Sequence, residues 1–227
     1  TQKVTLFRDC PALYLTYEAD WQQPWLMLKV IYETATEAVN TVSDQSYCAI
    51  KRSTVPKSRP DWARYEKIMH NYADLSTPED EWGIALLNEG KYAYDANGGT
   101  MRLTMLRTPE YPTTAAEAWA NLERQSRLDA GEGIPPRFAD LGFLRCRYAL
   151  LPHEGGALRK KDGSPNAVVK RAAEEFNTPL IVLPISEAAI SNSQQSKPQS
   201  DISAIKCTPE HVMVSSKIGR ASCRERV

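Results

Sequence analysis

The three histidines of the 227-residue chain are the first candidates for metal or acid–base chemistry. His70, His153 and His211 stand far apart and form neither an HxD pair nor an HExxH motif. Because a zinc site takes about three or four converging ligands, we predict no metal-binding residue in this chain. Glu66 and Asp74 would lie roughly 26 Å apart if they shared one strand, which is too far for paired carboxylate catalysis. We therefore predict no catalytic residue either.

Tyr47 and Arg52 are the main candidates for contact with a sugar. A phenol hydroxyl and a guanidinium fork both suit sugar hydroxyls, and an ordinary surface role is the alternative for both residues. His153 follows Pro152 at the end of a predicted strand, where a turn or an interdomain contact is the alternative to sugar binding. We expect His70 to be a packed, hydrogen-bonded histidine.

Charge and cysteine content narrow the class of protein. Lys+Arg and Asp+Glu balance at 28 residues each, which gives no reason to expect nucleic acid or a membrane as a partner. No apolar run approaches the about 20 residues that cross a bilayer, and the first residues do not resemble a signal peptide. Cys10, Cys48, Cys146 and Cys207 are widely spaced, which favours buried free thiols in a reducing compartment, with disulfides left open. We expect a cytoplasmic location.

Strands dominate the elements that must position these residues. Apolar alternation or short apolar runs predict extended segments at residues 12–20, 25–33, 35–42, 45–51, 65–75, 82–88, 92–95, 101–106, 148–152 and 180–183. Asn97-Gly98-Gly99 predicts a hairpin turn, and Ser43-Asp44 separates the two weaker strands before it. Pro56, Ser58 and Pro60 mark an exposed loop.

Two helices interrupt the strands. Thr114 and Glu117 begin a predicted helix over residues 113–130, and residues 165–177 predict a second one. The second helix is expected to turn Ala167, Val168, Ala172 and Phe176 toward the core, and a polar loop follows at 190–201. The regular strands favour a mainly β protein, an antiparallel β-sandwich with one or two inserted helices, over a parallel α/β sheet.

Four sequence blocks, in order, resemble the C-terminal half of glycoside hydrolase family 38, the retaining zinc-dependent α-mannosidases. The blocks are Tyr47–Thr54 with Ile50 and Arg52, then Asp61–Glu66 with Ala73–Ser76, then Gly83–Asn88 with Lys91-Tyr92 and Arg102–Arg107, and last Tyr148–His153 with Phe176-Asn177. The chain departs from the family where Leu144 and Cys146 replace its usual His and Phe, although Asp140 and Gly142 are kept. A divergent subfamily is the interpretation.

The resemblance implies a galactose-mutarotase-like supersandwich, with residues 1–216 as a C-terminal β-domain that is incomplete at both ends. It implies a retaining α-mannosidase that hydrolyses α-D-mannosides, whose catalytic domain and zinc lie outside this chain. The segment would support that domain and wall its substrate cleft, so its partner is an α-mannoside or oligosaccharide reached through the missing domain. A surface left bare by that domain would permit a homo-oligomer. The alternatives are a freestanding carbohydrate-binding module and an unrelated β-sandwich.

The last residues, 217–227, look foreign to the rest. Residues 218–227 (IGRASCRERV) resemble the translation of a common sequencing-library adapter, with a natural basic tail as the alternative. Removing them takes away three Arg and one Glu, so the remaining chain is slightly acidic. The basic tail is therefore not interpreted as a nucleic-acid signal.

Overall fold

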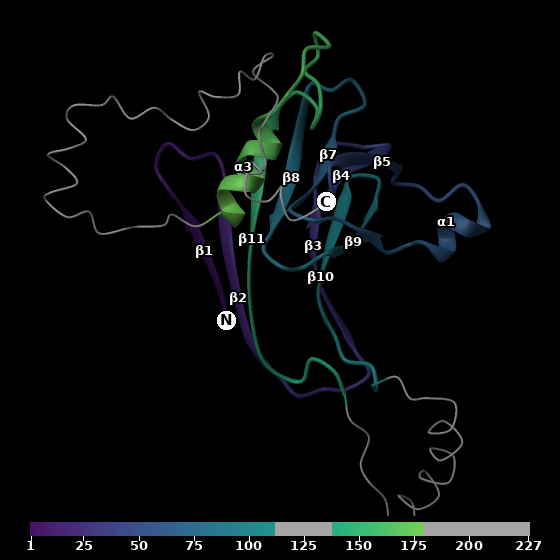
Figure 1. The fold of residues 1–227 in the computed structure, drawn as a ribbon, viewed down its shortest axis with the longest axis vertical. Helices are drawn as coiled ribbons and strands as arrows, with labels where there is room; N and C mark the ends of the chain where they lie inside the picture. Colours follow the sequence, from purple (N-terminus) through teal and green to yellow (C-terminus); the bar gives the residue numbers. More distant parts are fainter. Residues whose placement is uncertain (112–137, 179–227) are drawn as a thin grey trace, which may run out of the picture.

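The computed structural model of the protein describes residues 1–111 and 138–178, arranged as two antiparallel sheets and two helices (Figure 1). The predicted helix at 113–130, the extended segment at 180–183, the loop at 190–201 and the tail at 217–227 lie outside these residues, as do Cys207 and His211. No helix among the described residues is long and apolar enough to cross a membrane.

Both sheets are antiparallel throughout, as the sequence predicts. The larger sheet has the strand order β1 (Gln2–Leu6), β2 (Leu13–Trp21), β11 (Gly142–Glu154), β8 (Trp82–Asn88), β7 (Tyr72–Ser76), β4 (Asn40–Gln45) and β5 (Cys48–Ser53). The smaller has the order β3 (Met27–Glu33), β10 (Thr100–Arg107), β9 (Ala93–Asn97) and β6 (Lys67–Ile68). The prediction of a mainly β sandwich is confirmed.

The main core lies between the two sheets. Alternate residues of the strands face inward because side chains on a strand point to opposite faces. The inward set includes Leu15, Leu75, Leu86, Tyr148, Tyr94, Met101, Leu103 and Met105. The phenol of Tyr32 on β3 donates to that of Tyr148 on β11 at 2.9 Å, which joins the two sheets through their buried centre.

A second core lies on the outer face of the larger sheet, where α3 (Val168–Asn177) covers β8 and β11 (Figure 1). Val169 and Ala173 of α3 are fully buried there, with Ala172 and Phe176 packed beside them. The predicted helix is confirmed, but the prediction that Val168 faces the core is wrong. Val168 is about half exposed, and its neighbour Val169 is buried instead. Val169, Ala172, Ala173 and Phe176 follow the i, i+3, i+4, i+7 spacing of one helix face, which leaves Val168 at its exposed edge.

Two hairpins test the turn predictions. β9 and β10 are joined by Gly98-Gly99, as predicted, and Gly98 has φ 55°, a conformation that favours glycine. The β4–β5 turn is at Ser46-Tyr47, so the predicted break at Ser43-Asp44 is wrong. Ser43 is fully buried within β4, where its hydroxyl donates to the Ile68 carbonyl at 3.2 Å.

The chain between residues 56 and 76 departs most from the sequence prediction. The expected loop contains a short helix, α1 (Arg59–Ala63), which Ser58 caps by accepting from the Asp61 amide. The expected single extended segment at 65–75 is two strands in different sheets, β6 and β7. Glu66 and Asp74 therefore do not share a strand, and the premise of their 26 Å separation is wrong.

Candidate functional site

A cavity of about 630 Å3 lies between the tip of the β4–β5 hairpin and α3. We call it the hairpin groove; its walls are residues 44–49 of the hairpin, His70, Asn71 and Tyr72 beside β7, Ala157 and Leu158, and residues of α3 and the segment before it, including Asn166, Lys170 and Glu174. Its volume is typical of small-molecule sites, and aromatic, amide and charged groups converge on it. Of the three residues predicted to contact a sugar, Tyr47 lines the hairpin groove, whereas Arg52 and His153 do not.

Tyr47 lies at the second position of the two-residue hairpin loop. Its φ of 68° lies in the left-handed region that asparagine or glycine normally occupies in such loops. Its side chain is fully exposed at 103%. The hairpin therefore presents a bulky aromatic ring to solvent at some backbone cost, an arrangement that suits contact with a ligand or partner.

Asp44 holds the opposite wall of the hairpin groove in place. Its carboxylate accepts the backbone N–H groups of His70 and Asn71 at 2.9 Å, and that of Tyr72 at 3.1 Å. These bonds pin the chain where it crosses from the smaller sheet to the larger. The sequence analysis placed Asp44 in a break between strands and gave it no such role, because its partners lie 26–28 residues further along the chain.

His70 differs from the prediction of a packed histidine. Its side chain is exposed, and its ring lies 6.2 Å from that of Tyr92, centroid to centroid. Only the backbone amide of His70 is held by Asp44. The prediction is wrong because the strand expected around His70 is interrupted there.

Arg52 lies on β5 and faces a different cavity, of about 460 Å3. Its Nη1 donates to the Ser43 hydroxyl at 2.9 Å and to the Ile68 carbonyl at 3.4 Å. Tyr47 and Arg52 thus line two separate cavities, and the structure does not bring these two candidates together. Their contact with a sugar stays a prediction.

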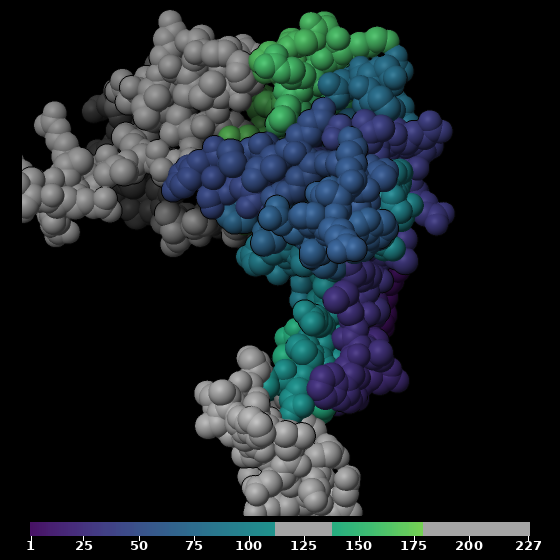
Figure 2. Space-filling view, turned by 90° about the vertical axis from the view of Figure 1, so that its right-hand side faces the viewer, coloured from purple at the N-terminus to yellow at the C-terminus, as the bar shows by residue number. Residues whose placement is uncertain are grey.

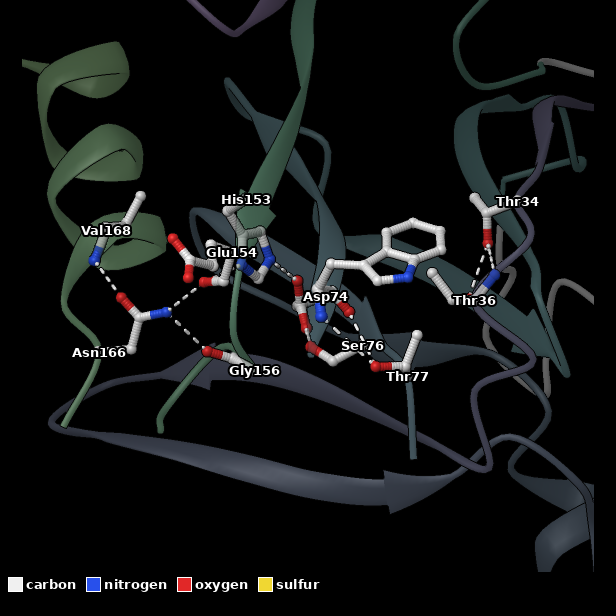
Figure 3. Close-up of polar contacts among 11 residues, drawn as sticks. Thr34, Thr36, Asp74, Ser76, Thr77, His153, Glu154, Gly156, Asn166 and Val168 are labelled. Carbon is white, nitrogen blue, oxygen red and sulfur yellow. Dashed lines mark hydrogen bonds and ion pairs between the residues drawn. The ribbon is translucent and has the colours of Figure 1, made fainter. Parts of the chain in front are cut away.

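His153 is buried in the larger sheet at the centre of a polar network (Figure 3). Its Nε2 donates to Oδ2 of Asp74 at 2.6 Å, and the Ser76 hydroxyl donates to Oδ1 of the same carboxylate at 2.5 Å. The side chains of His153 and Asp74 are 1% and 0% exposed. We call these three residues the His–Asp–Ser network. Because its histidine is enclosed, any effect of His153 on a sugar would be exerted through neighbouring residues.

Gly83 makes this network possible. His153 and Ser76 both face Gly83 in the strand pairing, on β11 and β7 on either side of β8. A Cβ on Gly83 would lie 2.7 Å from the Ser76 hydroxyl and 2.8 Å from the His153 ring. The missing side chain therefore leaves the space through which His153 reaches Asp74 across the middle strand.

The order of the network excludes one kind of chemistry. In serine hydrolases the histidine stands between the serine and the carboxylate, and it removes the serine proton. Here Asp74 stands between Ser76 and His153, so Ser76 bonds directly to the carboxylate. A serine whose hydroxyl donates directly to a carboxylate, rather than to a histidine, is not activated as a nucleophile. The network links β7 to β11 through the hydrogen bond between Asp74 and His153.

Gly83→Ala should destabilise the protein by about 1–3 kcal/mol, because the added methyl would overpack the network. The measurement is the free energy of unfolding from urea denaturation. The matched control is Ala85→Gly on the same strand and face, which removes a methyl and creates a small cavity but leaves the His153–Asp74 bond in place. If Gly83→Ala alone left the free energy of unfolding unchanged, the close approach at Gly83 would be refuted.

The asparagine that precedes α3 links the network to the hairpin groove (Figure 3). Nδ2 of Asn166 donates to the carbonyls of Glu154 and Gly156 at 3.0 and 2.9 Å. Its Oδ1 accepts the Val168 amide at 3.2 Å, which satisfies a donor in the first turn of the helix. The end of β11, with His153, is thereby fixed relative to α3.

The described cysteines are free, but only one is buried. Cys146 lies in the main core, Cys10 is half-buried and Cys48 is exposed beside Tyr47. The prediction of buried thiols is therefore confirmed for Cys146, wrong for Cys48 and met only in part by Cys10. Burial raises the pKa of the Cys146 thiol and opposes formation of its reactive thiolate.

Thiol labelling should separate these cysteines. In a Cys207→Ser/Cys223→Ser protein at neutral pH, we expect Ellman's reagent to modify Cys48 rapidly and Cys146 only after denaturation. Cys48→Ser should abolish the rapid phase, which provides the control. Equal rates for Cys48 and Cys146 in the folded protein would contradict their placement.

Zinc, which the resemblance implies for the parent enzyme, does not fit the residues present. No group of three or more His, Cys, Asp or Glu side chains able to hold a metal ion occurs among residues 1–111 and 138–178. The buried carboxylates are used otherwise: Asp74 bonds His153, and Asp95 bonds Lys29 and Arg102 at 2.5 Å each. These carboxylates are therefore committed to internal contacts in the described part of the chain.

Comparison with known proteins gives one family. The Glycosyl hydrolases family 38 C-terminal domain matches residues 1–115. Alpha-mannosidase 2C1 of Mus musculus is 29% identical over 184 residues, which are 81% of this chain and 15% of that protein. An alpha-mannosidase of Saccharomyces cerevisiae is 32% identical over 105 residues, 46% of this chain and 7% of that protein. The chain thus spans only a small part of the length of these relatives.

A solved structure supports the fold. The crystal structure of an alpha-mannosidase from Enterococcus faecalis V583 matches with a TM-score of 0.52 at 15% identity, over 68% of this chain and 16% of that one. Three of the four motif blocks seen in the sequence meet in the His–Asp–Ser network, through Asp74 and Ser76, Gly83, and His153. The chain belongs to glycosyl hydrolase family 38, of which it carries C-terminal-domain sequence.

Proposed function

We propose that the chain is a noncatalytic segment of a longer retaining α-mannosidase, in which it supports the catalytic domain and walls the substrate cleft. The match of residues 1–115 to the family's C-terminal domain carries this proposal. The small share of the relatives' length that the chain covers supports it, since most of such a protein lies outside this segment.

The chemistry is assigned to the remainder of the longer protein. Retaining hydrolysis needs two carboxyl groups about 5–5.5 Å apart, one as nucleophile and one as acid. A zinc ion that holds sugar hydroxyls would need its own ligands. The proposal therefore places the nucleophile, the acid and the zinc on that remainder, and the α-mannoside reaches this chain only as part of the cleft wall.

Tyr47 is the residue proposed to contact the substrate from this chain. Its exposed ring and its position in the wall of the hairpin groove support the assignment. Arg52 and His153 were predicted with it; Arg52 lines another cavity, and His153 would act by fixing the end of β11. The free thiols at Cys10, Cys48 and Cys146 support a reducing location, and the proposal therefore includes the cytoplasm.

Hydrolysis of a chromogenic α-mannoside with added zinc tests the proposal. We expect no activity from this chain alone and activity from the full-length protein that contains it. In that protein, Tyr47→Ala should raise KM several-fold with little change in kcat, whereas Tyr111→Ala, outside the groove, should change neither. Activity of this chain alone would overturn the noncatalytic assignment. Inactivity of the folded full-length protein would favour a carbohydrate-binding module instead.

A further inference from the structure

The cavity that contains Arg52 gathers positive side chains on one side of the molecule. It lies between β5, the loop after it and the segment around α1, which occupies the face shown in blue in Figure 2. We call it the basic cavity; its polar lining is Arg52, Arg64, Lys67, Tyr65, Ser53 and Thr54, together with the carboxylates Asp61 and Glu66. Its volume of about 460 Å3 falls within the usual range of small-molecule sites.

The side chains of Arg52, Arg64 and Lys67, the three cations of the basic cavity, form no ion pair with a carboxylate of the described residues. Arg52 uses only Nη1, for the Ser43 hydroxyl and the Ile68 carbonyl. Among the described residues the guanidinium of Arg64 has no ion pair or hydrogen bond, and Nζ of Lys67 has only a long contact to the Ala96 carbonyl at 3.4 Å. The N–H donors of Arg64, and those of Arg52 and Lys67 that these contacts do not use, therefore remain available to a ligand.

The carboxylates nearby are already engaged. Asp61 lines the basic cavity but accepts the Ser58 hydroxyl and the Lys57 amide. Glu66 is bound by Lys29 and accepts the Thr104 hydroxyl at 3.1 Å. Neither carboxylate lies within ion-pair distance of the three cations, although the pKa of Asp61 is lowered by its hydrogen bond from Ser58 and, to a smaller extent, by the charge of Arg64. Three cations against two carboxylates leave the lining with one excess positive charge.

The ammonium group of Lys67 is partly desolvated in the basic cavity. Lys67 is half-buried, and burial lowers the pKa of its ammonium group; the carboxylate of Asp95 opposes this shift, and the positive charge of Arg52 adds to it. A bound anion would compensate the desolvated charge. Guanidinium forks bind planar or tetrahedral oxyanions through two parallel hydrogen bonds, which an ammonium group supplements as a point charge.

We propose that the basic cavity is an oxyanion-binding site, in which Arg52, Arg64 and Lys67 hold a phosphate group. The phenol of Tyr65 and the hydroxyl of Ser53, which itself donates to the Val55 carbonyl, line the remainder and suit the polar body of a sugar phosphate. Free inorganic phosphate would present the same oxyanion to the three cations. The site is separate from the hairpin groove and does not depend on the proposed role in a mannosidase.

Isothermal titration calorimetry at constant ionic strength tests the site with inorganic phosphate, mannose 6-phosphate and mannose as probes. We expect both phosphates to bind and mannose not to bind. Tighter binding of mannose 6-phosphate would identify a sugar phosphate as the ligand, and equal affinities would identify the free oxyanion. Absence of binding by either phosphate at millimolar concentration would overturn the proposal.

Three charge-removing variants make the test specific. Arg64→Gln and Lys67→Gln should each weaken phosphate binding about tenfold, because each removes one charged donor from the ligand. Lys160→Gln removes an exposed positive charge outside the cavity and should leave affinity unchanged. Circular dichroism confirms that each variant is folded. Equal loss of affinity in all three would indicate nonspecific attraction and would also overturn the proposal.

Discussion

Asp74→Ala should lower the free energy of unfolding by about 3–5 kcal/mol, the cost of removing one partner from a buried polar pair. The carboxylate of Asp74 is 0% exposed and receives both His153 and Ser76. Its loss leaves the buried imidazole of His153 without its partner and removes the acceptor of the half-buried Ser76 hydroxyl. Urea denaturation followed by circular dichroism measures the change.

Two comparisons make this prediction specific. Asp74→Asn keeps the shape and can still accept from His153, so its effect should be smaller than that of Asp74→Ala. Glu154→Ala removes an exposed carboxylate one residue from His153, and we expect a change within about 0.5 kcal/mol. An Asp74→Ala protein as stable as Glu154→Ala would contradict a stabilising role for the network.

A double-mutant cycle separates the His153–Asp74 bond from packing. His153→Leu and Asp74→Ala are combined, and the double variant should lose less stability than the sum of the single variants. We expect a coupling energy of about 0.5–3 kcal/mol, as for residues in direct contact. Additive losses would mean that the 2.6 Å contact contributes no net stability.

Asp95→Ala should be comparably damaging, with a loss of about 3 kcal/mol. Asp95 lies on the outer face of the smaller sheet, yet it is 0% exposed and accepts from both Lys29 and Arg102 at 2.5 Å. Removing it leaves two cations close together, with Arg102 also resting on the Tyr65 ring. The free energy of unfolding is again the measurement.

The control for Asp95 is an exposed ion pair in the same fold. Arg145 and Glu18 are paired at 3.3 Å across β11 and β2, and their side chains are 62% and 41% exposed. Glu18→Ala should therefore cost no more than about 1 kcal/mol, because solvent screens the pair. Equal losses for Asp95→Ala and Glu18→Ala would show that burial of Asp95 adds nothing. If high salt abolished the destabilisation by Asp95→Ala, the contacts of Asp95 with Lys29 and Arg102 would be screened by solvent like the surface pair.

Local sequence patterns were sufficient for most of the secondary structure. The apolar run Trp82–Asn88 is strand β8 at the predicted bounds, and the Gly98-Gly99 loop joins β9 to β10 as expected. These elements depend on alternation and on a turn that glycine alone adopts without strain, both of which are local properties. The second helix was found for the same reason, with its start displaced by three residues.

Local patterns failed where a tertiary contact decided the outcome. The polar Ser43-Asp44 pair suggested a turn, but Ser43 is buried against Ile68 and Asp44 binds the backbone of residues 70–72. The turn moved to Ser46-Tyr47, where Tyr47 accepts a positive φ. The segment 65–75 looked continuous because its break depends on that same Asp44.

The sequence alone was sufficient to predict an antiparallel β protein that resembles family 38, because apolar alternation and the order of the motifs are properties of the linear sequence. Only the tertiary structure decided which polar residues are buried and which line a cavity. His153 and Asp74 are 79 residues apart, and Lys29 and Asp95 are 66 residues apart. Such contacts depend on strand order and on the space left by Gly83, which no local pattern contains.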